Sequence, residues 1–147
     1  MLEILVINGP NLNLLGIREP KLYGGTSYES LCVDLITQGA DLGYKVTCEQ
    51  SNHEGVIIDL LQNARGKKAG VIINPAGYTH SSVSIRDALL IYDGPTIEVH
   101  LTQVASRESF RQVNLISDVV LGTVSGFGVY GYQLALLALH NHIQKRN

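Results

Sequence analysis

The chain has 147 residues, of which 45% are apolar and 16% are charged, and its 11 basic and 13 acidic residues give a formal net charge of −2. This length fits one domain over residues 1–147 that buries its own core. The apolar surplus favours buried central strands, a subunit interface or both. No basic run resembles a nucleic-acid footprint, and no stretch approaches the ~20 apolar residues of a membrane span. We therefore expect neither a nucleic acid nor a membrane as a partner.

The two cysteines carry information about the compartment. Cys32 falls in a predicted helix and Cys48 in a predicted strand. A core of this size needs no disulfide, so we expect two free thiols that behave as small buried apolar residues in a reducing compartment. The N-terminal segment has Glu3 and no basic region, and its apolar run is too short for a signal peptide. The expected location is the cytoplasm.

Five apolar runs of strand length recur along the chain. They cover residues 4–8, 45–49, 70–74, 96–101 and 118–124. The runs at residues 5–7 and 71–73 are continuously apolar rather than alternating, as in strands that are covered on both faces.

Helical patterns separate these runs. Thr26 with Glu29, and Ser51 with Glu54, form capping-box signatures, the first for a helix that ends near Gly43. Further helices are predicted over residues 82–92, 107–113 (a short turn) and 129–144. Strands that alternate with helices predict an α/β fold with an open five-stranded parallel sheet and helices on both faces. Its expected strand order is the flavodoxin-like order 2-1-3-4-5.

Polar residues cluster after three of these strands. Asn8-Gly9-Pro10-Asn11-Leu12-Asn13 follows the first, residues 74–80 follow the third, and Glu98-Val99-His100 closes the fourth. Asn, Gly and Pro also fill ordinary turns, so any one of these loops could be turn chemistry alone. Ligands of open α/β sheets bind outside the carboxyl ends of the strands, where all three loops converge. We expect the functional site there.

Two histidines are candidates for this site. Glu98 and His100 are two residues apart on a strand and share a face, so the carboxylate can orient the imidazole and favour its charged form, which suits a general acid. The alternative is a polar strand end exposed to water. His80 precedes a predicted helix and is either a residue of that turn or a substrate contact.

The loop from Leu15 to Gly25 has glycines near both ends, as a closing lid would. A free tyrosine is almost fully protonated at pH 7, but an arginine close to the oxygen of Tyr23, such as Arg18, would lower the phenol pKa. A phenolate shielded from water could then remove a proton beside a carbonyl group. An exposed loop tyrosine is the alternative.

Two other patterns are misleading. Gly126-Phe127-Gly128-Val129-Tyr130-Gly131 matches a dinucleotide-binding fingerprint, but no strand follows that could supply the acidic ribose ligand. These glycines, with Tyr130 and Tyr132, are predicted to serve helix–sheet packing. His140 and His142 are two apart on a helix and point to different sides, so they do not predict a metal site.

Four blocks in order resemble the type II dehydroquinases, and together they span nearly the whole chain. The first is Asn8-Gly9-Pro10-Asn11-Leu12-Asn13-Leu14-Leu15-Gly16 with Arg18-Glu19-Pro20 and Tyr23-Gly24. The others are Ile73-Asn74-Pro75 with Tyr78-Thr79-His80 and Arg86-Asp87-Ala88; Glu98-Val99-His100-Leu101 with Arg107-Glu108 and Phe110-Arg111; and Gly126-Phe127-Gly128 with Gly131-Tyr132. The resemblance implies an anti elimination of water from 3-dehydroquinate, giving 3-dehydroshikimate through an enolate, with no metal or other cofactor.

The resemblance also implies roles for the residues that release the proton. Tyr23 would be the phenolate base, Arg18 would activate it, and Arg107 would add a further cation to the loop. Asn11 would hold the water that stabilises the enolate.

The remaining implied roles concern the leaving group and the substrate. His100, oriented by Glu98, would protonate the departing C1 hydroxyl. The substrate carboxylate would bind to the backbone at Leu101 and Thr102. The side chains that would hold substrate hydroxyls are Asn74, His80 and Arg111.

The resemblance also bears on assembly, and the sequence differs from the family pattern at one site. The resemblance implies a dodecamer built as a tetramer of trimers, in which Asp87 reaches a neighbouring subunit's site. The family usually has Ser-Asn after His-Leu, whereas Thr102-Gln103 stands here. Thr102 keeps a hydroxyl and a backbone N–H for the carboxylate, while Gln103 carries an extra methylene.

The sequence allows two alternative interpretations of its function. The chain could be a flavodoxin-like binding or signalling module without catalysis, or an inactive homologue. A phosphorylated receiver domain needs acids where Asn8 and Asn74 stand, and a flavin binder needs a Ser/Thr-rich phosphate loop after the first strand. An inactive homologue fits poorly with the retention of Tyr23, Arg18 and His100. Whether the product feeds aromatic amino acid biosynthesis through the shikimate pathway or comes from quinate catabolism stays open.

Overall fold

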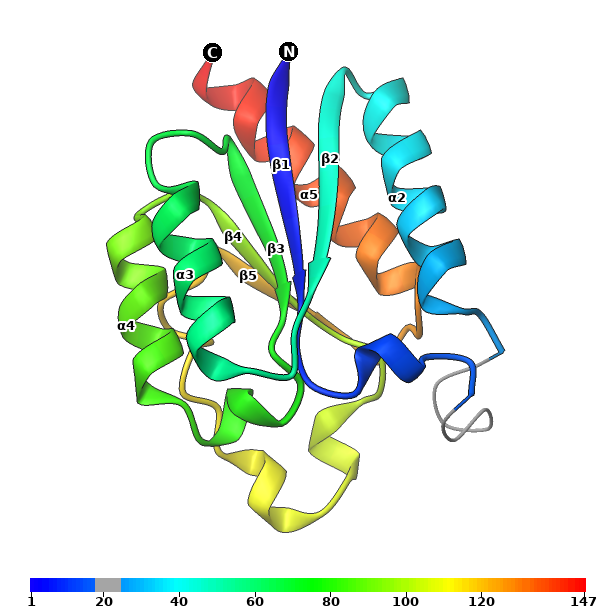
Figure 1. Cartoon of the computed structure of the whole chain (residues 1–147), viewed down its shortest axis with the longest axis vertical. Coiled ribbons are helices and arrows are strands. Elements are labelled where there is room, and N and C mark those ends of the chain that lie inside the picture. Colours follow the sequence, from blue (N-terminus) through cyan, green and yellow to red (C-terminus); the bar gives the residue numbers. More distant parts are fainter. Residues whose placement is uncertain (18–24) are drawn as a thin grey trace.

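The computed structural model describes residues 1–17 and 25–147. Five strands form one parallel sheet in the order β2-β1-β3-β4-β5, which confirms the predicted flavodoxin-like order. Figure 1 shows the twisted sheet between its helices. The strands are β1 (Leu2–Asn8), β2 (Tyr44–Gln50), β3 (Gly70–Asn74), β4 (Thr96–His100) and β5 (Gly122–Ser125).

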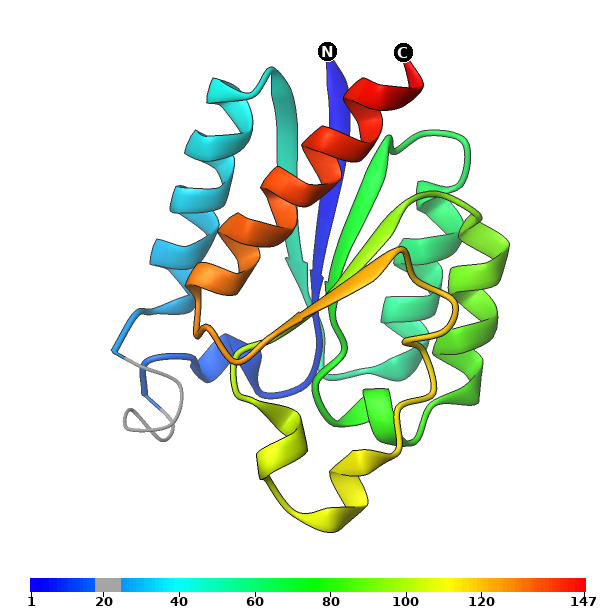
Figure 2. The ribbon, with the colours of Figure 1, turned by 180° about the vertical axis from the view of Figure 1, so that it is seen from behind.

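Helices cover both faces of the sheet. The α-helices are α2 (Tyr28–Asp41), α3 (Glu54–Ala64), α4 (Val83–Tyr92) and α5 (Tyr130–Arg146). Figures 1 and 2 place α3 and α4 over one face and α2 and α5 over the other. Short 3-10 turns follow the strands, namely η1 (Leu12–Leu14), η2 (Ala76–His80), η3 (Val104–Ser106) and η4 (Ser109–Gln112). No helix among the described residues is both long and apolar enough to cross a bilayer.

The core is divided by the sheet into two layers, and alternate residues of each central strand supply them. In β1, Ile4 and Val6 face α2 and α5, whereas Leu5 and Ile7 face α3 and α4. All five residues of β3 are buried, and so are all five of β4. In β3 this explains the continuous apolar run, since both faces of a central parallel strand are covered. In β4 the apolar residues alternate with three buried polar ones, Thr96, Glu98 and His100.

The order of the strands reverses between β1 and β3, and their carboxyl ends remain close together. Gly9 donates its N–H to the carbonyl of Asn74 at 2.8 Å. A Cβ atom at Gly9 would lie 2.6 Å from the carbonyl oxygen of Pro75, so glycine allows the two loops to approach. The loop after β1 then turns toward the α2 side, which opens a crevice at this end of the sheet.

The fifth strand is shorter than predicted. The sequence favours a strand over residues 118–124, but β5 begins at Gly122. Val119 instead closes a turn by donating its N–H to the carbonyl of Ile116 at 3.0 Å, and Ile116 is fully buried. Val119 and Val120 therefore pack against the α3–α4 layer from a turn, because tertiary packing outweighs their strand propensity.

Both capping-box predictions are wrong in detail. Helix α2 is capped by Ser27, whose hydroxyl accepts the N–H of Ser30 at 3.1 Å, rather than by Thr26. Helix α3 begins at Glu54 and its N-cap is His53, whereas the Ser51 hydroxyl accepts the His53 N–H at 2.9 Å and stabilises the preceding turn. Ser and Thr stabilise turns by the same kind of bond, so the pattern cannot separate the two cases.

The other helices follow the prediction within one or two residues. Helix α4 has Ser82 as its N-cap and ends at Tyr92, and its C-cap, Asp93, adopts left-handed dihedrals. The predicted short turn is η4, and α5 extends two residues beyond the predicted end. Cys32 and Cys48 are free, as predicted, but half-buried rather than fully buried.

A close contact between α2 and β2 gives a first prediction. Gly39 is buried, and a Cβ atom there would overlap a methyl group of Val46, whereas Gly55 in α3 has open space around it. We expect Gly39→Ala to lower the free energy of unfolding by about 1–3 kcal/mol through overpacking. The matched Gly55→Ala should raise it by up to about 1 kcal/mol because alanine favours helix. Denaturant titration measures both, and equal effects at the two positions would contradict the packing described here.

Candidate functional site

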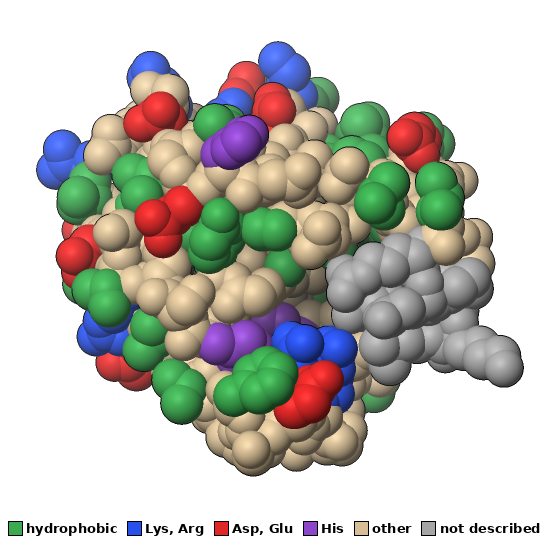
Figure 3. All heavy atoms as spheres, turned by 60° about the horizontal axis from the view of Figure 1, so that its bottom comes forward, with side chains coloured by type: hydrophobic (Ala, Val, Ile, Leu, Met, Phe, Trp, Pro, Cys, Tyr) green, Lys and Arg blue, Asp and Glu red, His purple; other side chains and the backbone are tan. Residues whose placement is uncertain are grey.

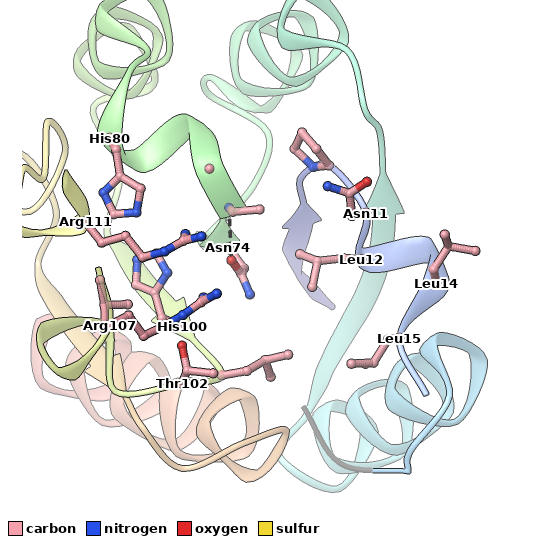
Figure 4. Close-up of a pocket in the computed structure, with 15 residues that line it drawn as sticks. Asn11, Leu12, Leu14, Leu15, Asn74, His80, His100, Thr102, Arg107 and Arg111 are labelled. Carbon is pink, nitrogen blue, oxygen red and sulfur yellow. Dashed lines mark hydrogen bonds between the residues drawn. The ribbon is translucent and has the colours of Figure 1, made fainter. Parts of the chain in front are cut away.

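A cavity of about 160 Å³ lies at the carboxyl ends of β1, β3 and β4. Its walls come from the loops after these strands and from the η3–η4 segment, and Figure 4 shows His80, His100 and Arg111 on one side of it and Asn11 and Leu12 on the other. Of the predicted site residues, the cavity brings together Asn11, Asn74, His80, His100, Leu101, Thr102, Arg107 and Arg111. Leu12, Leu14 and Leu15 form an apolar wall beside Asn11.

The cavity is cationic although the chain has a net negative charge. His80, His100, Arg107 and Arg111 line it, and none of its described lining residues is acidic. Figure 3 shows histidine and cationic side chains gathered on this end of the molecule. The Arg111 guanidinium is paired with Glu108, and this hydrogen bond lowers the pKa of the Glu108 carboxyl. The cavity is therefore suited to an anionic ligand.

Glu98 and His100 form a buried pair at the end of β4. Glu98 is 0% exposed and His100 is 7% exposed, and Nε2 of His100 is bonded to Oε2 of Glu98. An ionised carboxylate can only accept hydrogen bonds, so Nε2 carries the proton of this bond and Nδ1 is the ring nitrogen free for another contact. The predicted strand-end pair is thus present, and it is not the water-exposed alternative.

Two further donors hold the Glu98 carboxylate. Asn114 donates from Nδ2 to Oε2 at 2.8 Å, and Thr123 donates from Oγ1 to Oε1 at 3.1 Å. Neither residue is predicted from the sequence. Thr123 lies within the predicted fifth strand, but its contact with Glu98 follows only from the β4–β5 register, in which the two residues are paired. Asn114 lies in an irregular segment and gives no sequence signal.

A second buried network supports Asn74 from below the cavity. Asn74 donates from Nδ2 to the Tyr132 hydroxyl at 3.0 Å, and this hydroxyl donates to Oδ1 of Asn8 at 2.6 Å. Burial raises the pKa of Tyr132 well above its usual range, which keeps the hydroxyl a donor. Asn74 also accepts the Ala76 N–H at 3.1 Å, so its amide is held at both ends. Tyr132 therefore does more than pack, while Tyr130, also predicted to pack, is 54% exposed.

His80 and Asn11 face the cavity from opposite walls. Nδ1 of His80 lies 2.6 Å from the carbonyl of Val113, which ties η2 to the segment before Asn114. Asn11 has left-handed dihedrals, with φ of 71°, and its N–H donates to Oδ1 of Asn52 at 3.0 Å. Asparagine tolerates this conformation better than most residues, which turns the chain at the cavity rim.

The glycine-rich segment at residues 126–131 shapes the same rim. Gly126 and Gly128 have φ of +96° and +60°, and they donate their N–H groups to the carbonyls of His100 and Leu101 at 3.3 and 2.8 Å. Of the three, only Gly131 lies against the sheet, where a Cβ atom would be in van der Waals contact with Val124 at 3.4 Å. The packing prediction is therefore wrong for the first two glycines, which instead fix the end of β4 beside Thr102.

Three further site predictions concern Arg18, Tyr23 and Asp87. Arg18 and Tyr23 lie outside the described residues. Asp87 is exposed on α4 and does not line the cavity. Among the residues that the structure describes, no group of three or more His, Cys, Asp or Glu could hold a metal ion. His140 lies against the Tyr44 hydroxyl, with Nδ1 at 2.9 Å.

Comparison with known proteins identifies the family. Residues 2–140 match the family model described as dehydroquinase class II. The chain is 48% identical to 3-dehydroquinate dehydratase 1 of Agrobacterium fabrum, covering 94% of this chain and 95% of that one. It is 51% identical to the 3-dehydroquinate dehydratase of Halalkalibacterium halodurans, covering 95% and 96%.

Solved structures agree with these relatives. The type II dehydroquinase from Propionibacterium acnes superposes with a TM-score of 0.93 at 41% identity, covering 96% of this chain and 97% of that chain. The one from Butyrivibrio crossotus gives a TM-score of 0.91 at 45% identity, covering 94% and 97%. The sheet order, the cavity at the strand ends and the matched length lead to one conclusion: this chain belongs to the class II dehydroquinase family.

Proposed function

We propose that this chain, acting as a single catalytic domain, eliminates water from 3-dehydroquinate to give 3-dehydroshikimate. The observation that carries the proposal is the buried Glu98–His100 pair at the edge of a cationic cavity, in a chain of the class II dehydroquinase family. The substrate is a carboxylate with several hydroxyl groups and a ketone, and the cavity offers cations and amides to bind them. A binding module without catalysis is not favoured, because its ligand would need no acid of this kind.

The chemistry needs one base, one acid and a group that stabilises an enolate oxygen. The C2 proton is acidic because it lies beside the ketone, and its removal gives an enolate. The hydroxyl at C1 is β to the ketone, so the enolate expels it once it is protonated, and water leaves. Each step is a proton transfer or an electrostatic contact that side chains can supply. The reaction as proposed therefore uses no metal or other cofactor.

His100 is the proposed acid. Its Nε2 is engaged by Glu98, so a proton on Nδ1 is the one available to the departing hydroxyl. Glu98 stabilises the positively charged ring before the transfer and keeps its plane fixed. The pair thereby supplies the proton in a defined direction, which is the main requirement for general acid catalysis.

Tyr23 is the proposed base, and Arg18 and Arg107 are the proposed cations around it. Tyr23 and Arg18 are supported by the family motif that contains them, and Arg107 is supported by its place in the lining of the cavity. A phenolate is a weak enough base to exist near neutral pH beside a guanidinium, yet strong enough to take a proton next to a ketone. Asn11, at the rim, is proposed to hold the water that stabilises the enolate oxygen.

The remaining lining groups are proposed to bind the substrate. Asn74, His80 and Arg111 are suited to hydroxyl groups, and the backbone at Leu101 and Thr102 is suited to the carboxylate. Asn74 is held in one orientation by Tyr132 and Ala76, so its binding geometry exists before the ligand arrives. Such preorganisation lowers the entropic cost of binding.

We also propose a homo-oligomer, a dodecamer arranged as a tetramer of trimers, in which Asp87 reaches a neighbouring site. Val83, Leu90 and Ile91 are 58%, 54% and 48% exposed, and with Asp87 they lie on one face of α4. An apolar stripe around a carboxylate supports a subunit contact there. A location in the cytoplasm is proposed too, and the free thiols of Cys32 and Cys48 are consistent with a reducing compartment.

The direct test of the activity is to add the purified protein to 3-dehydroquinate and follow ultraviolet absorbance. Elimination creates a double bond conjugated with the ketone, so an absorption band should grow with time. No band at any pH around neutrality would contradict the proposed activity and favour the binding module.

The first prediction about the proposed function concerns the base. Tyr23→Phe should reduce kcat by at least about a thousandfold while substrate affinity stays within about threefold, because the phenol oxygen is needed mainly in the transition state. Steady-state kinetics and calorimetric titration measure the two quantities. Near-normal turnover by this variant would assign the base to another residue.

The second prediction concerns metals. Incubation with an excess of EDTA, followed by its removal, should leave kcat and KM unchanged, because the acid and the base are side chains of the chain itself. The control is the same protein with added Zn²⁺ or Mg²⁺, which should not raise the rate. Lost activity that a metal restores would contradict the scheme.

The third prediction concerns assembly. Leu90→Arg should shift the particle from the mass of a dodecamer to a smaller species, because it places a charge in the apolar stripe on α4. Gln62→Arg, at an exposed polar position of α3, is the matched control and should leave the mass unchanged. Light scattering after size exclusion measures both. A monomeric wild-type protein at micromolar concentration would overturn this part of the proposal.

A further inference from the structure

We propose that Asn114 and Thr123 are positioning residues that hold the Glu98 carboxylate in the orientation His100 requires. The inference rests on the proposed function, since it assigns these residues to the acid half of that reaction. Neither is expected to touch the substrate, and neither lines the cavity. They act through Glu98, which in turn acts on the imidazole.

The surroundings of Glu98 create the need for such donors. Its side chain is 0% exposed and lies in the sheet between the in-register residues Ile73 on β3 and Thr123 on β5. The adjoining layer includes the fully buried Ile73 and Ile116. A carboxylate without water must be satisfied by protein donors, or it becomes neutral and loses its attraction for a charged imidazole.

Asn114 is a fixed donor rather than a freely rotating one. Its Oδ1 accepts the backbone N–H groups of Ile116 and Ser117, each at 2.9 Å, and its Nδ2 donates to Glu98 at 2.8 Å. A rotated amide would point its NH₂ group at two N–H donors and its oxygen at a carboxylate. The orientation of the amide is therefore determined by its three partners.

The segment that carries Asn114 is itself anchored on both sides. Leu115 donates its N–H to the carbonyl of Thr79 at 2.9 Å, and Arg86 donates from Nη1 to the carbonyl of Leu115 at 3.0 Å. The guanidinium of Arg86 is also paired with Asp118. These contacts tie the donor of Glu98 to α4 and to η2, the turn that carries His80.

Thr123 supplies the second donor from the edge strand. Its Oγ1 lies 3.1 Å from Oε1 of Glu98, whereas Asn114 and His100 both bind Oε2. The two oxygens of the carboxylate are therefore held from different directions. This arrangement fixes the rotation of the carboxylate group, so that Oε2 stays directed at Nε2 of His100. If Asn114 and Thr123 only stabilised the fold, their hydrogen bonds to Glu98 would not need to orient its carboxylate toward His100.

The decisive variants remove a donor and change little else. Thr123→Val keeps the shape and the strand propensity of the side chain. We expect it to lower kcat by about threefold to tenfold with KM within about twofold, because a hydrogen bond to a charged group is lost while the cavity is intact. Thr123→Ser keeps the hydroxyl and should recover most of the loss. Thr47→Val on β2 is the matched control for the substitution itself, and it should be neutral.

Asn114→Asp gives an independent test. It keeps an oxygen for the N–H groups of Ile116 and Ser117 and replaces the donor to Glu98 by an acceptor, so kcat should fall by at least about tenfold while the fold remains. If this variant does not fold, the comparison of Thr123→Val with Thr123→Ser tests the inference by itself. Wild-type kcat in Thr123→Val or Asn114→Asp, or equal losses in Thr123→Val and Thr123→Ser, would overturn the inference.

A spectroscopic readout separates this inference from the proposed function. In ¹⁵N-labelled protein, the Nε2 signal of His100 should show a hydrogen-bonded N–H in the wild type, and it should shift in Thr123→Val but not in Thr47→Val. An unchanged signal in Thr123→Val contradicts the positioning role. If the wild type shows this signal but does not turn over 3-dehydroquinate, the proposed function fails while the contact stands.

Discussion

The buried carboxylate of Glu98 is the constraint on which the proposed site depends. It has no contact with water, and it is held by a side chain from β4 itself, one from the neighbouring strand and one from the segment before that strand. A charge in this position is costly unless every oxygen is satisfied. Two neutral donors, Asn114 and Thr123, hydrogen-bond to the carboxylate, and its third partner is the imidazole of His100. A buried charge thus becomes a fixed electrostatic partner for a proton donor at the cavity edge.

The fold explains why the cavity lies beside this pair. Parallel strands end at one edge of the sheet, and the reversed order between β1 and β3 separates the loops that follow them. The loop after β1 carries Asn11, the loop after β3 carries His80, and β4 ends in His100. Two buried networks, one on each face of the sheet, hold Asn74 and His100 in place. The lining is therefore set by the rigid sheet rather than by the loops alone.

The sequence predicts what depends on short-range pattern. The i, i+2 spacing of Glu98 and His100 places them on one face, and the polar strand ends indicate the correct edge of the sheet. It fails where long-range contacts decide. Asn114 and Thr123 reach Glu98 across 16 and 25 residues, and Tyr132 reaches Asn8 across 124. The predicted start of the fifth strand at residue 118 and the predicted N-cap at Thr26 are wrong for the same reason. In both cases packing selects one of several conformations that are equally favourable locally.

The most direct measurement of this account is a crystal structure of the protein with an unreactive analogue of 3-dehydroquinate bound. The account predicts Nδ1 of His100 within about 2.6–3.2 Å of the oxygen at C1, with Nε2 still bonded to Glu98, and the Tyr23 oxygen directed at C2. A bound analogue with its C1 oxygen far from His100, or a His100 ring turned away from Glu98, would contradict it.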